Sequence, residues 1–423
     1  MRGVLGDVRR AVGLPPAVRL ILASMVLFNI GFYLVVPFLA VHLSEQLHLA
    51  AWAVGLVLGV RTFSQQGLFF VGGSIADRFG ARPVVLVGVG LRVVGLVVLG
   101  FAGELWSVLV GAVLVGVAAA LFAPAVESLN AAYGHRLEVD GVLRRTELFG
   151  IEQMCSRLGS VVGPALGALL IAVPFRWTAV AAACLFTGLW VAFARLLPAE
   201  AGSRSPALRL VWRSVLGHRA FMVFVGLCAV QLLAYNQLYL MLPEQLQRSV
   251  GSQAALGWFF ACAAVLVIAG QAPVVRLAHR LGHRRAIVAG LATIALSFMA
   301  PPLMPGLAGL VVWVALLHAG QMLMVPPMRD VIGRLAGERH LGAHFGMLST
   351  VGGLLTLLGS SGVGWLYDQV DAGRAASGVP WWALAATVAA AAGLLWLCSA
   401  AGRLIPGGPD GSAPAVRRSR RGS

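Results

Sequence analysis

The sequence predicts an all-α polytopic membrane protein, with twelve transmembrane helices in two pseudo-symmetric six-helix bundles. Of its 423 residues, 59% are hydrophobic and 11% are charged, whereas soluble domains carry about 25% charged residues. A spanning helix needs about 20 apolar residues, so the apolar content suffices for roughly a dozen spans. A soluble enzyme is therefore excluded. The 52 glycines show no triplet period, which excludes a collagen-like chain.

Apolar runs place these spans along the chain. The first run follows Arg2, Arg9, Arg10 and Arg19, as in a signal peptide. It is too long for a cleaved signal, so we expect it to remain as the first span. The predicted spans are residues 18–42, 51–73, 84–103, 105–128, 148–172, 177–198, 220–242, 255–276, 286–304, 306–328, 341–366 and 379–402.

The basic residues predict the orientation of these spans. All 32 are Arg, and with a cytoplasmic N-terminus 26 of them fall on the cytoplasmic side. Only Arg176, Arg248 and Arg374 fall outside. Because positively charged loops stay in the cytoplasm, both termini are expected there. The absence of Lys and the many Arg residues suggest a bacterial protein, so the membrane is expected to be the bacterial cytoplasmic membrane. The net charge of +16 then reflects membrane topology, and no nucleic-acid partner is expected.

The longest connection, residues 199–219, separates an expected first half, residues 1–198, from a second half, residues 220–402. Its Arg residues alternate with apolar ones, which suits either a short helix on the membrane surface or a solvated linker. The tail, residues 403–423, is rich in Pro, Gly, Ser and Arg, and we expect it to be disordered and attracted to anionic lipid. The five cysteines stand singly in apolar runs, which predicts neither disulfides nor a metal site.

Short motifs recur at matching places in the two halves. Residues 77–82 (Asp-Arg-Phe-Gly-Ala-Arg) follow the second span, and residues 279–284 (His-Arg-Leu-Gly-His-Arg) follow the eighth, 202 residues later. A second match, 196 residues apart, relates Phe149, Gly150 and Gly163 of the fifth span to Phe345, Gly346 and Gly359 of the eleventh. Two repeats with a cavity between them are typical of transporters.

The loop after the second span resembles the signature loop of the major facilitator superfamily. Its Gly73, Asp77, Arg78, Gly80 and Arg82 stand at the spacing of that motif. The resemblance implies a two-state gate, in which Asp77 pairs with or caps the facing half in one state and releases it in the other. A solvated turn with weak surface ion pairs is the alternative.

The fifth span resembles the antiporter motif of the twelve-span drug:proton antiporters in that superfamily. The motif residues are Gly150, Gly159, Gly163, Pro164 and Gly167, with Ala168 in place of a final Gly. The resemblance implies that this kinked span packs against the eighth span and limits leak. Plain helix packing would also explain the glycines taken alone.

Three further stretches resemble MdtH-type multidrug-resistance transporters: residues 54–67, 241–243 and 364–368. The resemblance covers nearly the whole chain. It implies a monomer that exports small amphipathic drugs, driven by the proton gradient and without a further cofactor. The chain has Ala112 where the fourth span of that family often carries Arg, so coupling runs through other residues or is absent. The alternative is a transporter of a metabolite, with or without protons.

Four charged residues are predicted at membrane depth: Arg61, Arg92, Glu152 and Arg157. A charge there costs several kcal/mol unless it is paired or faces water, so each is a functional candidate. Glu152 is our first candidate for a proton carrier, and a fixed salt bridge to Arg61 or Arg157 is the alternative. Arg92 is expected to be structural or to extend to the membrane surface, because the third span is peripheral in this fold.

Glu127 and His318 are the other proton-carrier candidates, and Glu127 is also expected to join Arg82 in a charge cluster. An enzyme is not expected, because it would need an acid–base or metal-ligand cluster near one surface. The residues closest to such a cluster are His135 and Asp140, and they lie in a loop with many charges that explains them without catalysis. No phosphate-binding loop for ATP is present. The cavity candidates, each of which lines the cavity or bridges two helices, are Asn29, Arg61, Gln65, Gln153, Arg157, Gln231 and Asn236.

Overall fold

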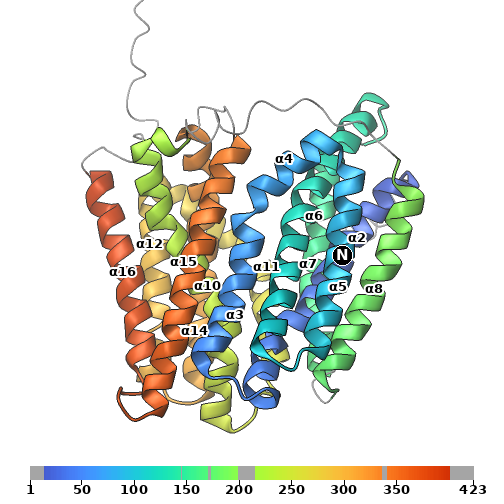
Figure 1. Ribbon diagram of the computed structural model, residues 1–423. Helices are drawn as coiled ribbons and strands as arrows, with labels where there is room; N and C mark the ends of the chain where they lie inside the picture. The colour runs from blue at the N-terminus through green and yellow to red at the C-terminus, as the bar shows by residue number, and fades with distance from the viewer. Residues whose placement is uncertain (1–13, 144, 170–172, 199–214, 336–340, 401–423) are drawn as a thin grey trace, which may run out of the picture.

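The computed structural model describes residues 14–143, 145–169, 173–198, 215–335 and 341–400, and Figure 1 shows their arrangement. This part of the chain is almost entirely helical and contains no strand. The predicted linker and tail fall largely or wholly outside it. The predicted all-α membrane fold is confirmed.

The first half contains six helical rods, two of which are composite. A π-helical turn, η1 (His42–Gln46), continues the first rod, and α4 (Phe69–Phe79) continues the second. The main helices are α2 (Pro16–Val41), α3 (Ala51–Gly67), α5 (Ala81–Phe101), α6 (Leu105–Val139), α7 (Arg145–Leu169) and α8 (Phe175–Leu196).

The second half repeats this order. A short helix, α13 (Ala300–Leu303), follows the third rod of this half. The main helices are α10 (Arg219–Val250), α11 (Leu256–Leu281), α12 (His283–Ser297), α14 (Leu307–Leu335), α15 (Leu341–Asp371) and α16 (Val379–Ala400).

Ten helical segments of the described chain are long and apolar enough to cross a membrane. The two other predicted spans are the second and the fifth. The second is broken at Leu68 into α3 and α4, of 17 and 11 residues. At the break the hydroxyl of Thr350 donates a hydrogen bond of 3.2 Å to the carbonyl oxygen of Gly67. This bond satisfies a carbonyl at the end of α3, because the last carbonyls of a helix have no partner within it.

Matching turns show that the halves are repeats. Gly80 and Gly282, which end α4 and α11, have positive φ angles of 86° and 74° that favour glycine. Arg82 donates to the carbonyl of residue 194 at 2.7 Å, and Arg284 donates to that of residue 396 at 3.2 Å. Donors and acceptors are both displaced by the 202 residues predicted from the sequence. The same displacement relates the contact of α5 with α6 to that of α12 with α14.

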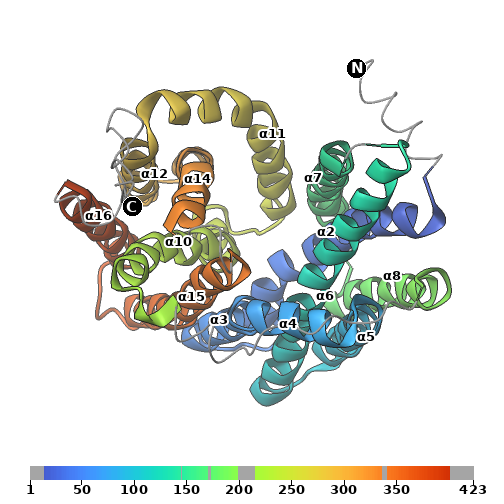
Figure 2. The ribbon, with the colours of Figure 1, turned by 90° about the horizontal axis from the view of Figure 1, so that it is seen from above.

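The halves meet along two pairs of helices, α3 with α15 and α7 with α11 (Figure 2). The repeat relates these pairs to each other, because α3 and α11 are the second rods of the two halves and α7 and α15 are the fifth. The first is close because glycines lie in the contact: a Cβ atom on Gly55 would lie 2.2 Å from the backbone oxygen of Ser360. One on Gly364 would lie 2.2 Å from that of Ala51. Small residues let membrane helices approach to backbone contact, so these glycines hold the two halves together.

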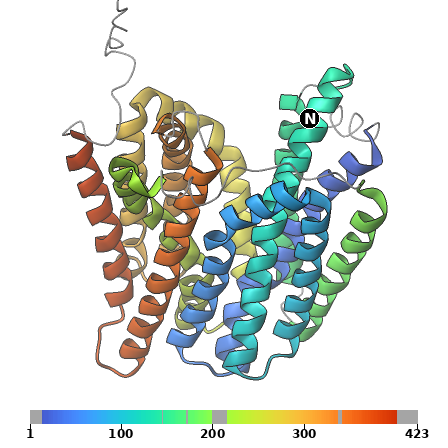
Figure 3. The same cartoon turned by 45° about the horizontal axis from the view of Figure 1, so that its top comes forward.

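The bundle has two ends, named here after residues that lie there. The Gly80 end, with the turns at Gly80 and Gly282, is the upper end in Figure 1 and is turned forward in Figure 3. The Ala51 end, where α3 begins, is the opposite one. The sequence predicts that the Gly80 end faces the cytoplasm.

We expect Gly364→Val to destabilise the protein, because its side chain must overlap the backbone of Ala51. Overpacking of this kind costs about 1–3 kcal/mol. The measurement is thermal unfolding of purified protein in detergent. Gly362→Val is the matched control on the same helix, since a Cβ atom there meets nothing within 4 Å. Equal melting temperatures for the two variants would show that the α3–α15 contact can relax around a side chain.

Candidate functional site

A seam between α2 and α7 forms one wall of the central region. Asn29 of α2 donates a hydrogen bond of 3.1 Å to the Ser156 hydroxyl and accepts one of 3.1 Å from Ser160. A Cβ atom on Gly159 would lie 2.5 Å from the carbonyl oxygen of Val26 in the same seam. These contacts fix the position of α7 beside α2.

Helix α7, the fifth span, packs against α11, the eighth span, as the antiporter motif predicted. However, Gly159, Gly163 and Gly167 all lie against α2, because the side chains of Asn29, Tyr33 and Phe38 occupy the space beside them. Pro164 is buried within the same helix. Gly150 lies near the start of α7, in a stretch whose side chains are outside the described set.

A cavity of about 200 Å³, called here the first-half cavity, lies among five rods of the first half. It combines an aromatic wall with charged and amide groups, among them four of the predicted site residues, Asn29, Gln65, Glu127 and Glu152. Its lining residues are Met25, Phe28, Asn29, Phe32, Gln65, Arg92, Ala119, Phe122, Ala123, Glu127 and Glu152.

Glu152 is buried in this cavity with 8% of its surface exposed. Its carboxylate accepts a hydrogen bond from the side-chain amide of Asn130 in α6. Within the described residues it makes no ion pair with Arg61 or Arg157, so the alternative of a fixed salt bridge is wrong for this conformation. The carboxylate is held by a neutral donor.

Glu127 lies one helix away on the same cavity and is exposed. The expected cluster of Glu127 with Arg82 is wrong, because the Arg82 guanidinium bonds the backbone of α8 instead. Both carboxyl groups of the first-half cavity thus lack a guanidinium partner from their own half.

Arg92 was predicted to be structural or to extend to the membrane surface, and the second alternative is wrong. Its side chain is 3% exposed and lines the first-half cavity. The guanidinium lies over the rings of Phe28, at 4.9 Å, and Phe186, at 4.7 Å. Aromatic faces attract a cation, which explains how α5 holds a charge inside the bundle.

Arg61 lies at the boundary between the halves, 5% exposed. Its guanidinium is over the ring of Phe32, at 5.3 Å, and is 3.4 Å from the hydroxyl of Thr62. That hydroxyl donates a hydrogen bond of 3.0 Å to the Asn236 side chain of α10. The polar chain from Arg61 to Asn236 therefore crosses between the halves.

A second cavity, about 180 Å³ and called here the interhalf cavity, lies between α2 and α7 on one side and α10, α11 and α14 on the other. Arg157 lines it together with Tyr33, Tyr235 and His318. The Nδ1 atom of His318 is 2.8 Å from the carbonyl oxygen of Val314, and its ring lies edge-on to Tyr235. This arrangement gives His318 a partner within its own helix.

The remaining cavity candidates take different places. The backbone carbonyl of Gln231 accepts a hydrogen bond of 3.1 Å from Gln321, so this residue bridges α10 and α14. Gln153 is exposed and lines neither cavity, in contrast to the prediction. Ser156 and Ser160 of α7 face Asn29, whereas the side chain of Gln153 is exposed.

The signature-loop residues lie at the Gly80 end. A Cβ atom on Gly73 would lie 3.6 Å from Pro124 of α6. Arg78 is exposed, with its guanidinium 5.5 Å from the ring centre of Phe79. Asp77 lies in α4, but its side chain is outside the described set, so its gate role stays a prediction.

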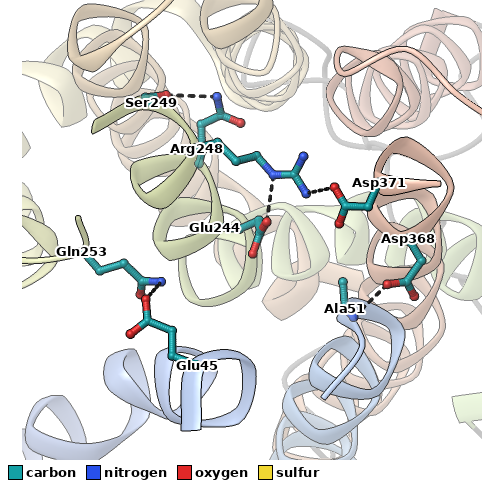
Figure 4. Close-up of polar contacts among 9 residues, drawn as sticks. Glu45, Ala51, Glu244, Arg248, Ser249, Gln253, Asp368 and Asp371 are labelled. Atoms are coloured by element: carbon teal, nitrogen blue, oxygen red, sulfur yellow. Dashed lines mark hydrogen bonds and ion pairs between the residues drawn. The ribbon is translucent and has the colours of Figure 1, made fainter. Parts of the chain in front are cut away.

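The Ala51 end is closed by polar contacts between the halves (Figure 4). The Asp368 carboxylate of α15 accepts hydrogen bonds from the backbone N–H groups of Ala51, at 2.9 Å, and Trp52, at 3.0 Å. Gln253 donates one of 3.0 Å to Glu45. A carboxylate at a helix N-terminus satisfies free N–H groups and favours the helix dipole, so Asp368 ties α15 to the start of α3.

Beside this contact, an ion-pair cluster lies wholly in the second half. Arg248 pairs with Glu244 and with Asp371, each at 2.8 Å. These residues join α10 to α15 and do not cross between the halves. The capping role of Asp368 could not be predicted, because its partner is backbone, which leaves no pattern in the sequence.

Comparison with known proteins agrees with this geometry. The Major Facilitator Superfamily model matches residues 21–244 and 229–420. An uncharacterised MFS-type transporter of Mycobacterium tuberculosis is 35% identical over 362 residues, which cover 82% of this chain and 84% of the relative. The multidrug resistance protein MdtH of Escherichia coli is 32% identical over 357 residues, which cover 82% of this chain and 86% of MdtH.

Solved structures show the same fold. A peptide transporter of the POT family has a TM-score of 0.74 at 14% identity, with 94% of this chain and 99% of the transporter covered. At that identity the likeness concerns the fold alone. The family model, the relatives and the repeated halves together show that this membrane transporter belongs to the major facilitator superfamily.

Proposed function

We propose that the protein exports amphipathic small molecules by alternating access, driven by inward movement of protons. The observation that carries the proposal is the first-half cavity, where the buried carboxyl group of Glu152 shares one space with an aromatic wall. Aromatic and apolar surfaces suit amphipathic molecules, and an ionisable group at membrane depth is a functional candidate. The similarity to MdtH supports a role in multidrug resistance.

Proton coupling is assigned to Glu152. It is the more deeply buried of the two carboxyl groups that line the cavity. With Asn130 as its only described hydrogen-bond partner, it can take up or release a proton without breaking an ion pair. Glu127 and His318 are the next candidates.

Alternating access is assigned to a rocking movement of the halves about the α3–α15 contact. The contacts of Asp368 and Glu45 close the Ala51 end in this conformation. The charge distribution supports a cytoplasmic Gly80 end, with both termini in the cytoplasm of a bacterial cell. The proposed halves are residues 1–198 and 220–402, and the proposed transporting unit is a monomer.

We expect Glu152→Gln to abolish drug-dependent proton movement, because Gln keeps the hydrogen-bonding shape but carries no exchangeable charge. The measurement uses protein in liposomes that contain a pH dye, under a proton gradient, with a panel of amphipathic drugs. At least a tenfold fall in drug-dependent proton flux is expected, as is typical for loss of a proton-transfer group. Glu138→Gln, an exposed carboxyl on α6, is the control and should transport normally.

Other outcomes would redirect the proposal. Coupled flux that persists in Glu152→Gln would move the coupling site to Glu127 or His318. Absence of drug-dependent proton movement in the wild type would favour a metabolite transporter, for which the apolar residue Ala112 in the fourth span is the motivating observation.

Asp368→Asn should open the Ala51 end more often, because it removes the charge and one acceptor from the start of α3. The loss of a carboxylate cap is worth about 1 kcal/mol, or roughly a fivefold change in population. Spin labels on the exposed residues Glu104 and Arg374, one in each half, would report the distance distribution.

Asp371→Asn is the matched control for this experiment, one helical turn further along α15. Its partner, Arg248, belongs to the same half, so the distribution should not change. Identical distributions for the two variants would mean that the contact with Ala51 does not hold the end closed.

A further inference from the structure

We propose that Arg92 is an anion-binding residue of the first-half cavity, and that this cavity takes amphipathic molecules that carry both an aromatic ring and a carboxylate or similar anionic group. The inference rests on the proposed transport function and narrows its substrate class. It depends on the burial of the Arg92 guanidinium, on its lack of an anionic partner and on the aromatic groups that surround it.

Arg92 is buried without an anionic partner. It is 3% exposed, lies within the membrane-spanning helix α5 and lines the cavity. Among the described residues it makes no ion pair, and its Nε–H group has no hydrogen-bond partner. A buried charge is expected to be paired, so this guanidinium is ready to bind an anion.

The aromatic rings hold Arg92 but do not replace an anion. The rings of Phe28 and Phe186 lie 4.9 and 4.7 Å from the guanidinium carbon. Cation–π contacts are weaker than the cost of burying a charge in a membrane. They also fix the direction of the guanidinium, and a preorganised guanidinium binds a carboxylate through two parallel hydrogen bonds.

The cavity's own carboxylates do not pair with Arg92 in this conformation. Glu152 accepts a hydrogen bond from Asn130, and among the described residues neither Glu152 nor Glu127 forms an ion pair with Arg92. Arg61 is a second buried guanidinium, 5% exposed, whose hydrogen bond to the Thr62 hydroxyl is 3.4 Å long. An incoming anion would offset this buried positive charge.

The rest of the cavity suits the aromatic part of such a molecule. The rings of Phe28 and Phe122 stack, with their centres 3.5 Å apart, and Phe32 lines the same space. A ligand ring can pack on this wall while its anionic group reaches Arg92. Gln65 and Asn29 supply amide groups at the cavity surface.

The test compares two probes that differ in one charge, dansyl-phenylalanine and its methyl ester, which bind to purified protein in detergent and are followed by dansyl fluorescence. We expect the wild type to bind the acid more tightly than the ester. In Arg92→Gln the Kd of the acid should rise at least about tenfold, while that of the ester changes less than about twofold. Arg92→Lys should keep part of the preference for the acid, because Lys retains the positive charge but cannot form the two parallel hydrogen bonds of a guanidinium.

Arg176→Gln is the control, since Arg176 is an exposed residue that lines neither cavity. Equal affinity of the wild type for the two probes would overturn the inference, and this result does not depend on any variant being folded. An equal loss of both probes in Arg92→Gln would also overturn it, because Arg92 would then act through packing.

The outcome for the anion site is separate from that for export. Acid-selective binding that depends on Arg92, combined with no transport in liposomes, would support the site and contradict export. Transport of the acid and the ester at equal rates, unchanged in Arg92→Gln, would support export and overturn the anion site.

Discussion

The contact between α3 and α15 is the constraint on which the rest of the structure depends. The two helices run antiparallel and touch through backbone because Gly55, Gly59 and Gly364 leave no side chains in between. The first-half cavity and the interhalf cavity both lie beside α2 and α7. The break at Leu68 belongs to the same contact, since Thr350 of α15 satisfies the carbonyl that ends α3.

Burial of charge is the second constraint, and the bundle meets it in two different ways. Glu152 is held inside its own half by Asn130, whereas the chain from Arg61 through Thr62 reaches Asn236 in the other half. A movement that separates the halves must break the second contact and can leave the first intact. The environment of Arg61 therefore depends on the conformation of the transporter far more than that of Glu152 does.

Much of the fold could be predicted from the sequence, because membrane depth and repeats are one-dimensional features. The turns at Gly80 and Gly282 and the bonds of Arg82 and Arg284 follow from a displacement visible in the sequence. The rotation of each helix is not visible there. Arg92 was predicted to be structural or to extend to the membrane surface, and it points inward because Phe28 and Phe186, far away in the sequence, provide its site.

The candidate site was predicted less completely for the same reason. Asn29, Gln65, Glu127 and Glu152 were identified as polar residues in or near the spans and do line one cavity. The partner of Glu152 could not be predicted, since the Asn130 amide carries no motif. The glycines of α7 were recognised by spacing, yet spacing alone does not say which neighbour fills the space beside them.

The antiparallel packing of α3 and α15 also links the two ends of the molecule. At each end, the C-terminus of one helical rod lies near the N-terminus of the other, where free N–H groups attract a carboxylate. At the Ala51 end Asp368 makes this contact with the start of α3. Asp77 lies at the corresponding end of the rod formed by α3 and α4, and α15 begins at that same Gly80 end. If the halves rock about the glycine contact, closing one end opens the other, so the contact of Asp368 with α3 and the gate contact predicted for Asp77 would belong to opposite conformations.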